Sequence, residues 1–357
     1  MLTLEKRGGD DHGGQGRLMM PSRRPATVRT ERLPDTGPRS PRAAAQPGVS
    51  LGSIAVWLPR GSRTIEDLRR HLDLTPAQVK VLTRVHGLRE VRTSPHATLR
   101  EGLLTAGAQT LGGVDDLHRV RYVLHAHTLQ DVAPSTVNVV HDVCDALGVG
   151  HATAFSVTQQ NCASGLLALD IAGKLLHQDD DADAVALLLM GEKPFTPLAQ
   201  LIPNTTVMGE AAVACVVRGG GDQDRLLSYY ARTRGQYSAG LELDAESRQA
   251  FEREYADTLS EVIHAAVSRA GLTLDEIVLV LPHNVNRSSW IRVARTLELS
   301  EDRLLLSNIP ALGHCYCADP FLNLVTAARE RRLRRGDHYV MAVVRLGATF
   351  AAAAFRH

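Results

Sequence analysis

Short, continuously apolar stretches alternate with amphipathic ones along most of this 357-residue chain, and this alternation constrains its fold most strongly. In the first half, RVRYVLHAH and AVALLLMG are separated by segments whose apolar residues recur at helical spacing. The same order begins again with the helical segment FEREYADTLSEVIHAAVSRAG, which is followed by the apolar stretch IVLVLPH. Strands that are apolar throughout must be covered on both faces, so the pattern predicts an α/β fold in which helices cover both sides of a sheet.

The chain divides into three parts by composition and repetition. Residues 1–48 are rich in Gly, Pro and Arg and lack apolar periodicity, which predicts a disordered arm. The strand–helix order is used twice after that arm, which suggests two similar halves at 49–222 and 223–357. Within the first half, APSTVNVVHDVCDALG predicts a helix with Pro134 just inside its start and a Gly at its end.

Charge and cysteine content exclude several classes of protein. The formal net charge is +1, so nothing in the overall balance favours nucleic acid or a membrane surface as the main partner. No apolar run is long enough to span a bilayer, and the N-terminus lacks the order of a secretory signal. Five cysteines are an odd number for a disulfide scaffold. We expect a cytoplasmic enzyme.

Cys162 is the first candidate catalytic residue. It lies where the strand TAFSVTQ runs into the apolar helix NCASGLLALDIAGKLL, so its thiol is expected near a helix N-terminus. Exposed amides and the helix dipole stabilise a thiolate there, and a thiolate attacks thioester carbonyls. A small buried cysteine that only packs the helix is the structural alternative.

Two histidines follow in the second half. His283 ends the apolar strand IVLVLP and precedes Asn286 by three residues, whereas His314 sits in a Gly-containing turn before a helix. Either side chain can project into a cleft from such a position. A thiol and two imidazoles supply a nucleophile, a proton carrier and a group that polarises a carbonyl oxygen.

These segments together resemble β-ketoacyl-[acyl-carrier-protein] synthase III, a family with the thiolase fold. LVLPHNVNRSSWIRVARTLELSEDRLLLSNIPALGH is similar to that family's stretch from its catalytic His-x-x-Asn motif to its third catalytic residue. GDHYVMAVVRLGATFAAAAFRH resembles its closing Gly-rich hairpin. SVTQQNCASGLLALDIA resembles the segment around its nucleophilic cysteine, and VMGEAAVACVV its Phe-Gly-Asp-Gly-Ala strand. The resemblance implies a layered αβαβα fold of two similar halves with the active site between them.

The resemblance also implies roles for individual residues. Cys162 takes an acyl group from an acyl-carrier-protein or acyl-CoA thioester, and its N–H forms an oxyanion hole with one from the hairpin at Leu346 and Gly347. His283 and His314 stabilise the enolate that forms when a malonyl-type thioester loses carbon dioxide. The product is a β-ketoacyl thioester. No metal or redox cofactor is implied, since phosphopantetheine enters with the substrate.

Further residues are implied to hold or shape this site. Asn286 helps to hold its loop and the histidine in place, and His127 lies near the wall of the pocket on the dimer side. The family is homodimeric, and a bulky residue in its members gates the acyl pocket of the partner subunit. Ala133 stands at that position here, which suggests a roomier acyl site.

Departures from the family point to a specialised branch in secondary metabolism. Synthase III has Asn where this chain has His314, so the catalytic set reads Cys-His-His, as in the chain-elongating synthases. Val81 stands about where CoA-using relatives have the Trp that stacks on adenine, which favours a carrier protein as donor. Arg345 replaces a hairpin glycine. That branch also contains enzymes that pass the acyl group to an alcohol or amine, with histidine as general base.

Two readings of other classes remain. His125-Ala126-His127 ends a strand in a pattern that is typical of metal sites, so a metal-dependent hydrolase is one alternative. It needs further ligands at later strand ends, and the other histidines, His141, His151, His283 and His314, do not follow a strand rhythm. A non-catalytic partner subunit is the other, because some relatives have lost their catalytic residues. The presence of all three candidate catalytic side chains argues against it.

Overall fold

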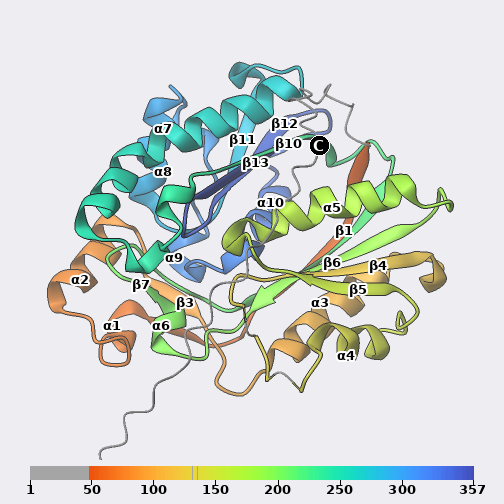
Figure 1. Ribbon diagram of the computed structural model, residues 1–357, viewed down its shortest axis with the longest axis horizontal. Coiled ribbons are helices and arrows are strands. Elements are labelled where there is room, and N and C mark those ends of the chain that lie inside the picture. Colours follow the sequence, from red (N-terminus) through yellow and green to blue (C-terminus); the bar gives the residue numbers. More distant parts are fainter. Residues whose placement is uncertain (1–47, 131, 135) are drawn as a thin grey trace, which may run out of the picture. The chain divides into compact units, whose positions relative to one another are not determined.

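The structure, a computed structural model, describes residues 48–130, 132–134 and 136–357. The predicted N-terminal arm lies outside these residues except for Gly48. A nine-stranded sheet organises the described chain, with strand order β11-β12-β13-β10-β1-β9-β6-β4-β5 (Figure 1). The strands of this sheet are β1 (Val49–Trp57), β4 (Val120–Ala126), β5 (Thr153–Val157), β6 (Val185–Glu192), β9 (Ala211–Gly219), β10 (Arg225–Thr233), β11 (Ile277–Pro282), β12 (His338–Val344) and β13 (Thr349–Arg356).

Helices and two small ribbons complete the fold. The helices are α1 (Ile65–Leu68), α2 (Pro76–Lys80), α3 (Leu99–Leu111), α4 (Val139–Ala146), α5 (Ser164–Gln178), α6 (Pro197–Gln200), α7 (Ala245–Arg269), α8 (Arg287–Thr296), α9 (Ile309–Leu312) and α10 (Asp319–Arg329). The ribbons pair β2 (Ser62–Thr64) with β3 (Glu90–Arg92) and β7 (Leu201–Ile202) with β8 (Thr206–Val207).

The sheet joins strands from the two parts of the chain at one point. Strands from 49–219 occupy the side that ends in β5, and strands from 225–356 occupy the side that ends in β11. β1 and β10 meet through the pair Ser50 and Arg225. Each side holds parallel pairs, β4 with β5 and β6 in the first and β11 with β12 in the second, as crossover connections through helices require.

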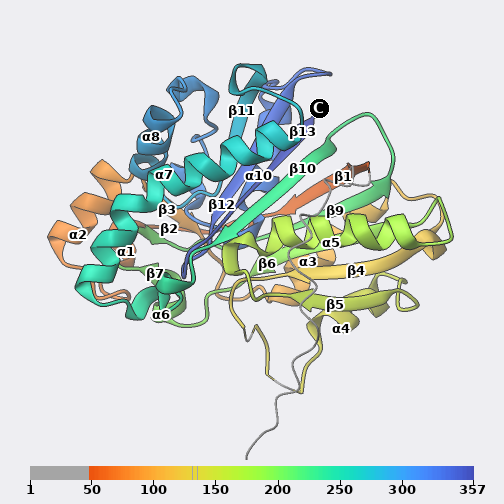
Figure 2. The same cartoon turned by 45° about the horizontal axis from the view of Figure 1, so that its top comes forward.

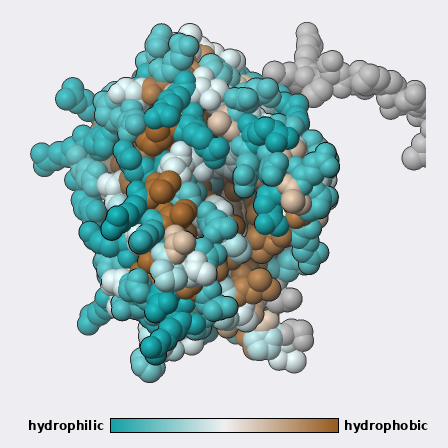
Figure 3. All heavy atoms as spheres, turned by 90° about the vertical axis from the view of Figure 1, so that its left-hand side faces the viewer, coloured by the Kyte–Doolittle hydropathy of each residue, from teal (hydrophilic) through white to brown (hydrophobic). Residues whose placement is uncertain are grey.

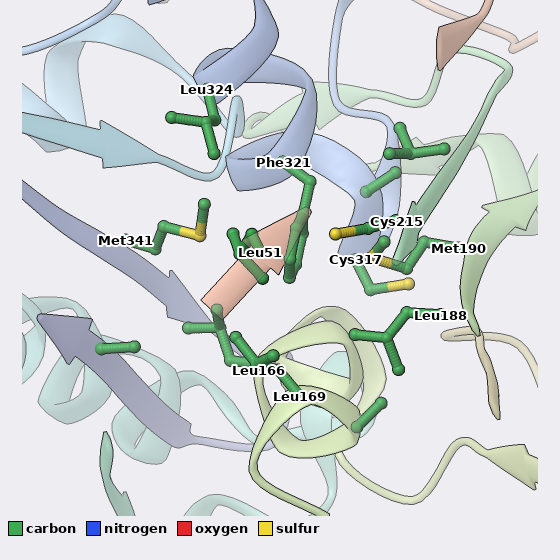
Figure 4. Packing of buried hydrophobic residues seen from close by; sticks show 14 of the residues in the cluster. Leu51, Leu166, Leu169, Leu188, Met190, Cys215, Cys317, Phe321, Leu324 and Met341 are labelled. Carbon is green, nitrogen blue, oxygen red and sulfur yellow. The ribbon is translucent and has the colours of Figure 1, made fainter. Parts of the chain in front are cut away.

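The helices and strands are arranged in layers (Figure 2), with clusters of buried side chains between them. α3 and α4 pack against one face of the first set of strands. α7 and α8 cover one face of the second set. α5 and α10 lie between the two sets, where Leu166 and Leu169 of α5 meet Phe321 and Leu324 of α10 and the strand residue Met341 (Figure 4). The predicted αβαβα layering is confirmed.

The central layer is aliphatic and tightly packed. Leu166 and Leu169 are each 1% exposed, and full burial of such a side chain stabilises a fold by roughly 2 kcal/mol. A glycine allows α5 to start close to its neighbours, because a Cβ on Gly165 would lie 2.7 Å from the Cys317 carbonyl oxygen. The segment that follows His314 therefore packs directly against the start of α5.

One predicted helix start was wrong. The helix expected from Pro134 begins at Val139 instead, because Asn138 caps it by accepting the His141 N–H at 3.3 Å. The helix after β11 begins at Arg287 because Asn286 accepts the Ser289 N–H at 2.8 Å. In both cases a capping asparagine determines where the helix starts.

Among the described residues no helix is long and apolar enough to cross a membrane. Figure 3 shows the face that lies at the left of Figure 1. Hydrophilic side chains cover most of this face, and hydrophobic ones are exposed through its middle.

Candidate functional site

Cys162 lies in a short turn of 3₁₀-helix between β5 and α5 and is 4% exposed. Asn161 before it adopts a left-handed conformation with φ 45°, which Asn tolerates better than most residues. The Ser164 hydroxyl donates to the Thr158 carbonyl at 3.1 Å and closes the loop around the cysteine. The thiol is thereby held at the N-terminal end of a buried helix.

A chain of hydrogen bonds runs from Cys162 through His314 to Asp319. The Cys162 Sγ lies 3.2 Å from Nε2 of His314, and Nδ1 of the same ring lies 2.5 Å from Oδ2 of Asp319. The side chains of His314 and Asp319 are both buried, at 1% and 0% exposure. This order of nucleophile, imidazole and carboxylate is that of a catalytic triad, in which the carboxylate fixes the ring's tautomer and orientation.

The Asp319 carboxylate is held by backbone and side-chain donors. Oδ1 accepts the Cys315 N–H at 2.8 Å and the side-chain amide of Asn284 at 3.1 Å, and Oδ2 accepts the Asn284 N–H at 2.5 Å. Asn323 donates to Oδ1 of Asn284 at 2.9 Å. A buried carboxylate surrounded by donors in this way stays oriented toward His314.

The charge of His314 follows from these neighbours. Burial of the ring opposes protonation, but the charges of Cys162 and Asp319 and the hydrogen bonds to them outweigh it and raise the pKa of His314 to about 10. The imidazole is therefore protonated at neutral pH. A protonated ring beside the sulfur stabilises the thiolate form that attacks a thioester.

His283 differs from His314 in its protonation state. Burial, followed by the charge of His314, holds the pKa of His283 well below its usual range, so this ring is neutral. The two imidazole rings are 5.8 Å apart between centroids. Nε2 of His283 lies 3.4 Å from the Tyr255 hydroxyl, and its Nδ1 has no hydrogen-bond partner among the described residues. A neutral imidazole keeps one N–H with which to polarise a carbonyl oxygen.

The turn between β12 and β13 approaches the nucleophile. The Asn161 side-chain amide donates to the Leu346 carbonyl at 3.4 Å, which ties this turn to the residue before Cys162. Gly347 and Ala348 have φ of 90° and 62°. A positive φ is a conformation that glycine adopts more easily than other residues, which explains the glycine at 347. In the described part of the chain the N–H groups of Leu346 and Gly347 have no hydrogen-bond partner, so they are free to donate to an oxyanion.

The other predicted site residues take supporting positions. Asn286 caps α8 and donates to the Thr205 carbonyl at 3.2 Å, so it fixes the loop after His283 and does not face the sulfur. Nδ1 of His127 lies 2.5 Å from the Leu129 carbonyl oxygen. Ala133 is partly buried against the cluster under α3 and α4. Its expected role concerns a partner subunit and remains a prediction.

Sequence reasoning missed two buried carboxylates near the nucleophile. Asp319 follows His314 by five residues, at the start of α10, and no motif used in the sequence analysis includes it. Glu192 ends β6, is 2% exposed and accepts the N–H groups of Thr128 and, at 2.6 Å, Leu129. Burial raises the pKa of Glu192 to about 7. The Thr128 hydroxyl lies 3.9 Å from the Cys162 Sγ, so Glu192 holds a segment that borders the site.

The histidine pair that suggested a metal site makes other contacts. Nε2 of His125 lies 3.2 Å from the Gly191 carbonyl oxygen, and His127 is bound to Leu129 as described above. Among residues 48–130, 132–134 and 136–357, no group of three or more His, Cys, Asp or Glu side chains is arranged to hold a metal ion. The described residues therefore contain no ligand set for the metal-dependent hydrolase that the sequence left as an alternative.

Comparisons with known proteins relate this chain to one family. Residues 267–357 match the family model "3-Oxoacyl-[acyl-carrier-protein (ACP)] synthase III C terminal". The chain is 24% identical over 322 residues to β-ketoacyl-[acyl-carrier-protein] synthase III of Aquifex aeolicus, covering 87% of this chain and 100% of that one. It is 27% identical over 252 residues to the enzyme of that name from Rhizorhabdus wittichii, covering 66% of this chain and 76% of that one.

Solved structures show the same fold. The acyltransferase ChlB3 superposes with a TM-score of 0.76 at 18% identity, covering 87% of this chain and 98% of that one. The synthase III of Aquifex aeolicus superposes with a TM-score of 0.72 at 21% identity, covering 87% of this chain and 100% of that one. The chain is thus a thiolase-fold relative of β-ketoacyl-[acyl-carrier-protein] synthase III, a family of condensing acyltransferases.

Proposed function

We propose that this protein carries an acyl group as a thioester on Cys162 and transfers it to a carbon nucleophile. The observation that carries the proposal is the Sγ of Cys162 at 3.2 Å from His314, whose far nitrogen is held by Asp319. In the first step the thiolate attacks the carbonyl carbon of an acyl thioester. The bond from that carbon to the donor's sulfur breaks, and the departing thiolate takes the proton of the His314 imidazolium.

Condensation would follow on the acyl-enzyme. His314 first regains a proton from solvent. A malonyl-type thioester then loses carbon dioxide, and N–H groups of His283 and His314 stabilise the resulting enolate oxygen. The carbanion then attacks the Cys162 thioester, whose C–S bond breaks to release a β-ketoacyl thioester and restore the thiolate. The neutral state of His283 supports this role, because one of its nitrogens carries a proton at any pH at which the enzyme works. The curated relatives bear the name of this reaction.

Asp319 favours a second candidate, transfer to an alcohol or amine. An imidazole whose Nδ1–H is bound to a carboxylate is a better general base, as in hydrolytic triads. Acylation removes the thiolate charge that helps to keep His314 protonated, and the ring can then accept a proton from the acceptor. The attacking oxygen or nitrogen would form the new bond to the acyl carbon as the C–S bond breaks. The product would be an ester or an amide.

A carrier protein is the proposed donor, and a homodimer the proposed assembly. Three arginines and one carboxylate line an open depression of about 550 Å³ between α7 and α8, namely Arg253, Arg292, Arg295 and Glu252. Basic side chains there suit the acidic surface of a carrier protein or the phosphate of its pantetheine arm. The charge reversal Arg295→Glu is expected to slow acylation by a carrier-bound donor and to leave acylation by a pantetheine-free thioester unchanged. Equal effects on both donors would contradict docking at this depression.

Intact-protein mass spectrometry tests the covalent step. The protein is mixed with a panel of acyl thioesters, with and without a malonyl thioester, beside the Cys162→Ala variant. A mass gain on the wild type alone supports the acyl-enzyme. Discharge of the adduct by malonyl thioester favours condensation, whereas discharge only by an alcohol or amine favours the second candidate. If no thioester in a broad panel labels Cys162, the proposed function is wrong.

A further inference from the structure

Arg345 is an unpaired cation in the active-site hairpin. It directly precedes Leu346 and Gly347, is half-buried, and its Nε is buried without a hydrogen-bond partner among the described residues. In that part of the chain no carboxylate lies within ion-pair distance of its guanidinium. Arg234, on the neighbouring strand end, differs because its Nη2 lies 2.6 Å from Glu254. Of these two arginines, only Arg345 has no carboxylate partner among the described residues.

The guanidinium lies beside the turn that is expected to bind the oxyanion. A Cβ placed on Gly347 would lie 3.5 Å from Cζ of Arg345 and 3.6 Å from one of its terminal nitrogens, so the side chain folds over this turn. The same turn is tied to the nucleophile's neighbour through the 3.4 Å hydrogen bond from Asn161 to Leu346. The Arg345 side chain therefore lies on the turn that is hydrogen-bonded to Asn161, the residue before Cys162.

A cation in this position is expected to bind an anion. Only Nε of the Arg345 guanidinium is buried without a partner, so its terminal nitrogens remain accessible to an anion that approaches the turn. The guanidinium's planar set of donors fits a carboxylate or a phosphate with two parallel bonds. The phosphate of a pantetheine donor lies at the far end of the arm from the thioester, so a carboxylate on the reacting molecule is the better match for a group beside the oxyanion turn.

We propose that Arg345 binds a carboxylate that the reacting molecule keeps, in the first instance on the acyl group of the donor thioester. The donor would then be the half-thioester of a small dicarboxylic acid. This inference rests on the proposed acyl-enzyme. A carboxylate destined to leave as carbon dioxide does not fit, because an ion pair to Arg345 would stabilise it in the ground state and oppose decarboxylation.

The test compares two donors of similar length that differ in charge. The acylation rate of Cys162 is measured by intact mass with succinyl and butyryl thioesters of N-acetylcysteamine, on the wild type, Arg345→Gln and Arg345→Lys. We expect the wild type to prefer the succinyl donor and the preference to fall about tenfold or more in Arg345→Gln, since one charge-assisted contact is worth about that factor. Arg345→Lys should keep part of it, because it retains the charge without the planar fork.

A second experiment tests whether the bound carboxylate belongs to the acceptor and not to the acyl donor. The wild type and Arg345→Gln are loaded with the butyryl group, and discharge is compared for an amino acid and its amide. A preference for the carboxylate that disappears in Arg345→Gln supports the same site with the acceptor as its source. Arg335→Gln is the matched control, because Arg335 is 86% exposed and lies in a surface pair with Asp222.

Failure of this inference is distinct from failure of the proposed function. If both donors label Cys162 at equal rates and no acceptor preference exists, or if Arg345→Gln slows charged and uncharged reactants equally, Arg345 does not bind a carboxylate. If neither donor labels Cys162, the acyl-enzyme itself is refuted. Retention of butyryl acylation by Arg345→Gln shows that the variant is folded.

Discussion

His314 and Asp319 form a fully buried pair in which the carboxylate oxygen lies 2.5 Å from Nδ1 of the imidazole, and the opposite nitrogen of the ring faces Cys162. The pair fixes which nitrogen is available to the sulfur. It also links the nucleophile at the start of α5 to the start of α10, so the two helices of the central layer carry one catalytic unit. Chemistry at Cys162 should therefore depend on a residue that never touches substrate.

Replacement of Asp319 by Asn should lower the reactivity of Cys162 at neutral pH. The charges of Cys162 and Asp319 raise the pKa of His314 to about 10 against the effect of burial, and loss of one charge lowers it. Less imidazolium then supports the thiolate. Alkylation by iodoacetamide at pH 7 should slow by about tenfold, because loss of one contact to a charged group costs about 1.5 kcal/mol. The difference between the two proteins should shrink as the pH rises through about 10, where His314 loses its proton in the wild type as well.

The control for this variant is its folding and its alkaline rate. Circular dichroism should match the wild type, and the alkylation rates of the two proteins should converge at high pH. Equal rates for Asp319→Asn and wild type at pH 7 would mean that the carboxylate does not act through His314.

Replacement of His283 by Ala should separate the two chemical steps. The neutral His283 ring makes no hydrogen bond to Cys162, so the acylation rate should change little. Loss of an enolate donor should slow decarboxylative condensation by about a hundredfold or more. Carbon dioxide release from malonyl thioester measures the second step, and intact mass measures the first. A loss of acylation as large as the loss of condensation would assign His283 to the nucleophile instead.

Much of the fold could be predicted because its strands carry their signal locally. β6 is an almost continuous apolar run and β4 is largely apolar, and Cys162, His283 and His314 stand in segments that resemble a known family. Asp319 could not be assigned in this way. It reaches His314 only because the intervening residues form a tight turn with Tyr316 at φ 56°, which local sequence does not specify.

Neither the role of Glu192 nor the pairing of the two sets of strands could be predicted from the sequence, for a related reason. Glu192 continues an apolar strand, and its contacts come from a segment more than sixty residues earlier. The pair of Ser50 and Arg225 that joins β1 to β10 connects distant parts of the chain. Long-range contacts of this kind leave no periodic trace in one sequence.

Glu192 should make stability fall as the pH rises through neutrality. Burial raises its pKa from 4.5 to about 7, so the folded state binds a proton that the unfolded state has lost. The stabilisation is fully present below about pH 4.5 and is lost as the pH rises through 7, with a size on the order of 3 kcal/mol. Urea unfolding of wild type and Glu192→Gln between pH 5 and 8 measures it. The wild type should lose stability relative to the variant across this range, and a constant difference would contradict the shift.

Asn284 and Asn286 should differ in what their loss affects. Asn284 donates twice to Asp319, so Asn284→Ala should leave the carboxylate short of partners and slow alkylation of Cys162 at neutral pH several-fold. Asn286 caps α8, so Asn286→Ala should chiefly lower the free energy of unfolding, by about 1 kcal/mol. Urea unfolding and the pH profile of alkylation are measured on both variants. Only Asn284→Ala should shift the midpoint of that profile, because only its amide reaches the triad. A shift of equal size in Asn286→Ala would show that the loop after His283, and not the contact to Asp319, sets the reactivity of the thiol.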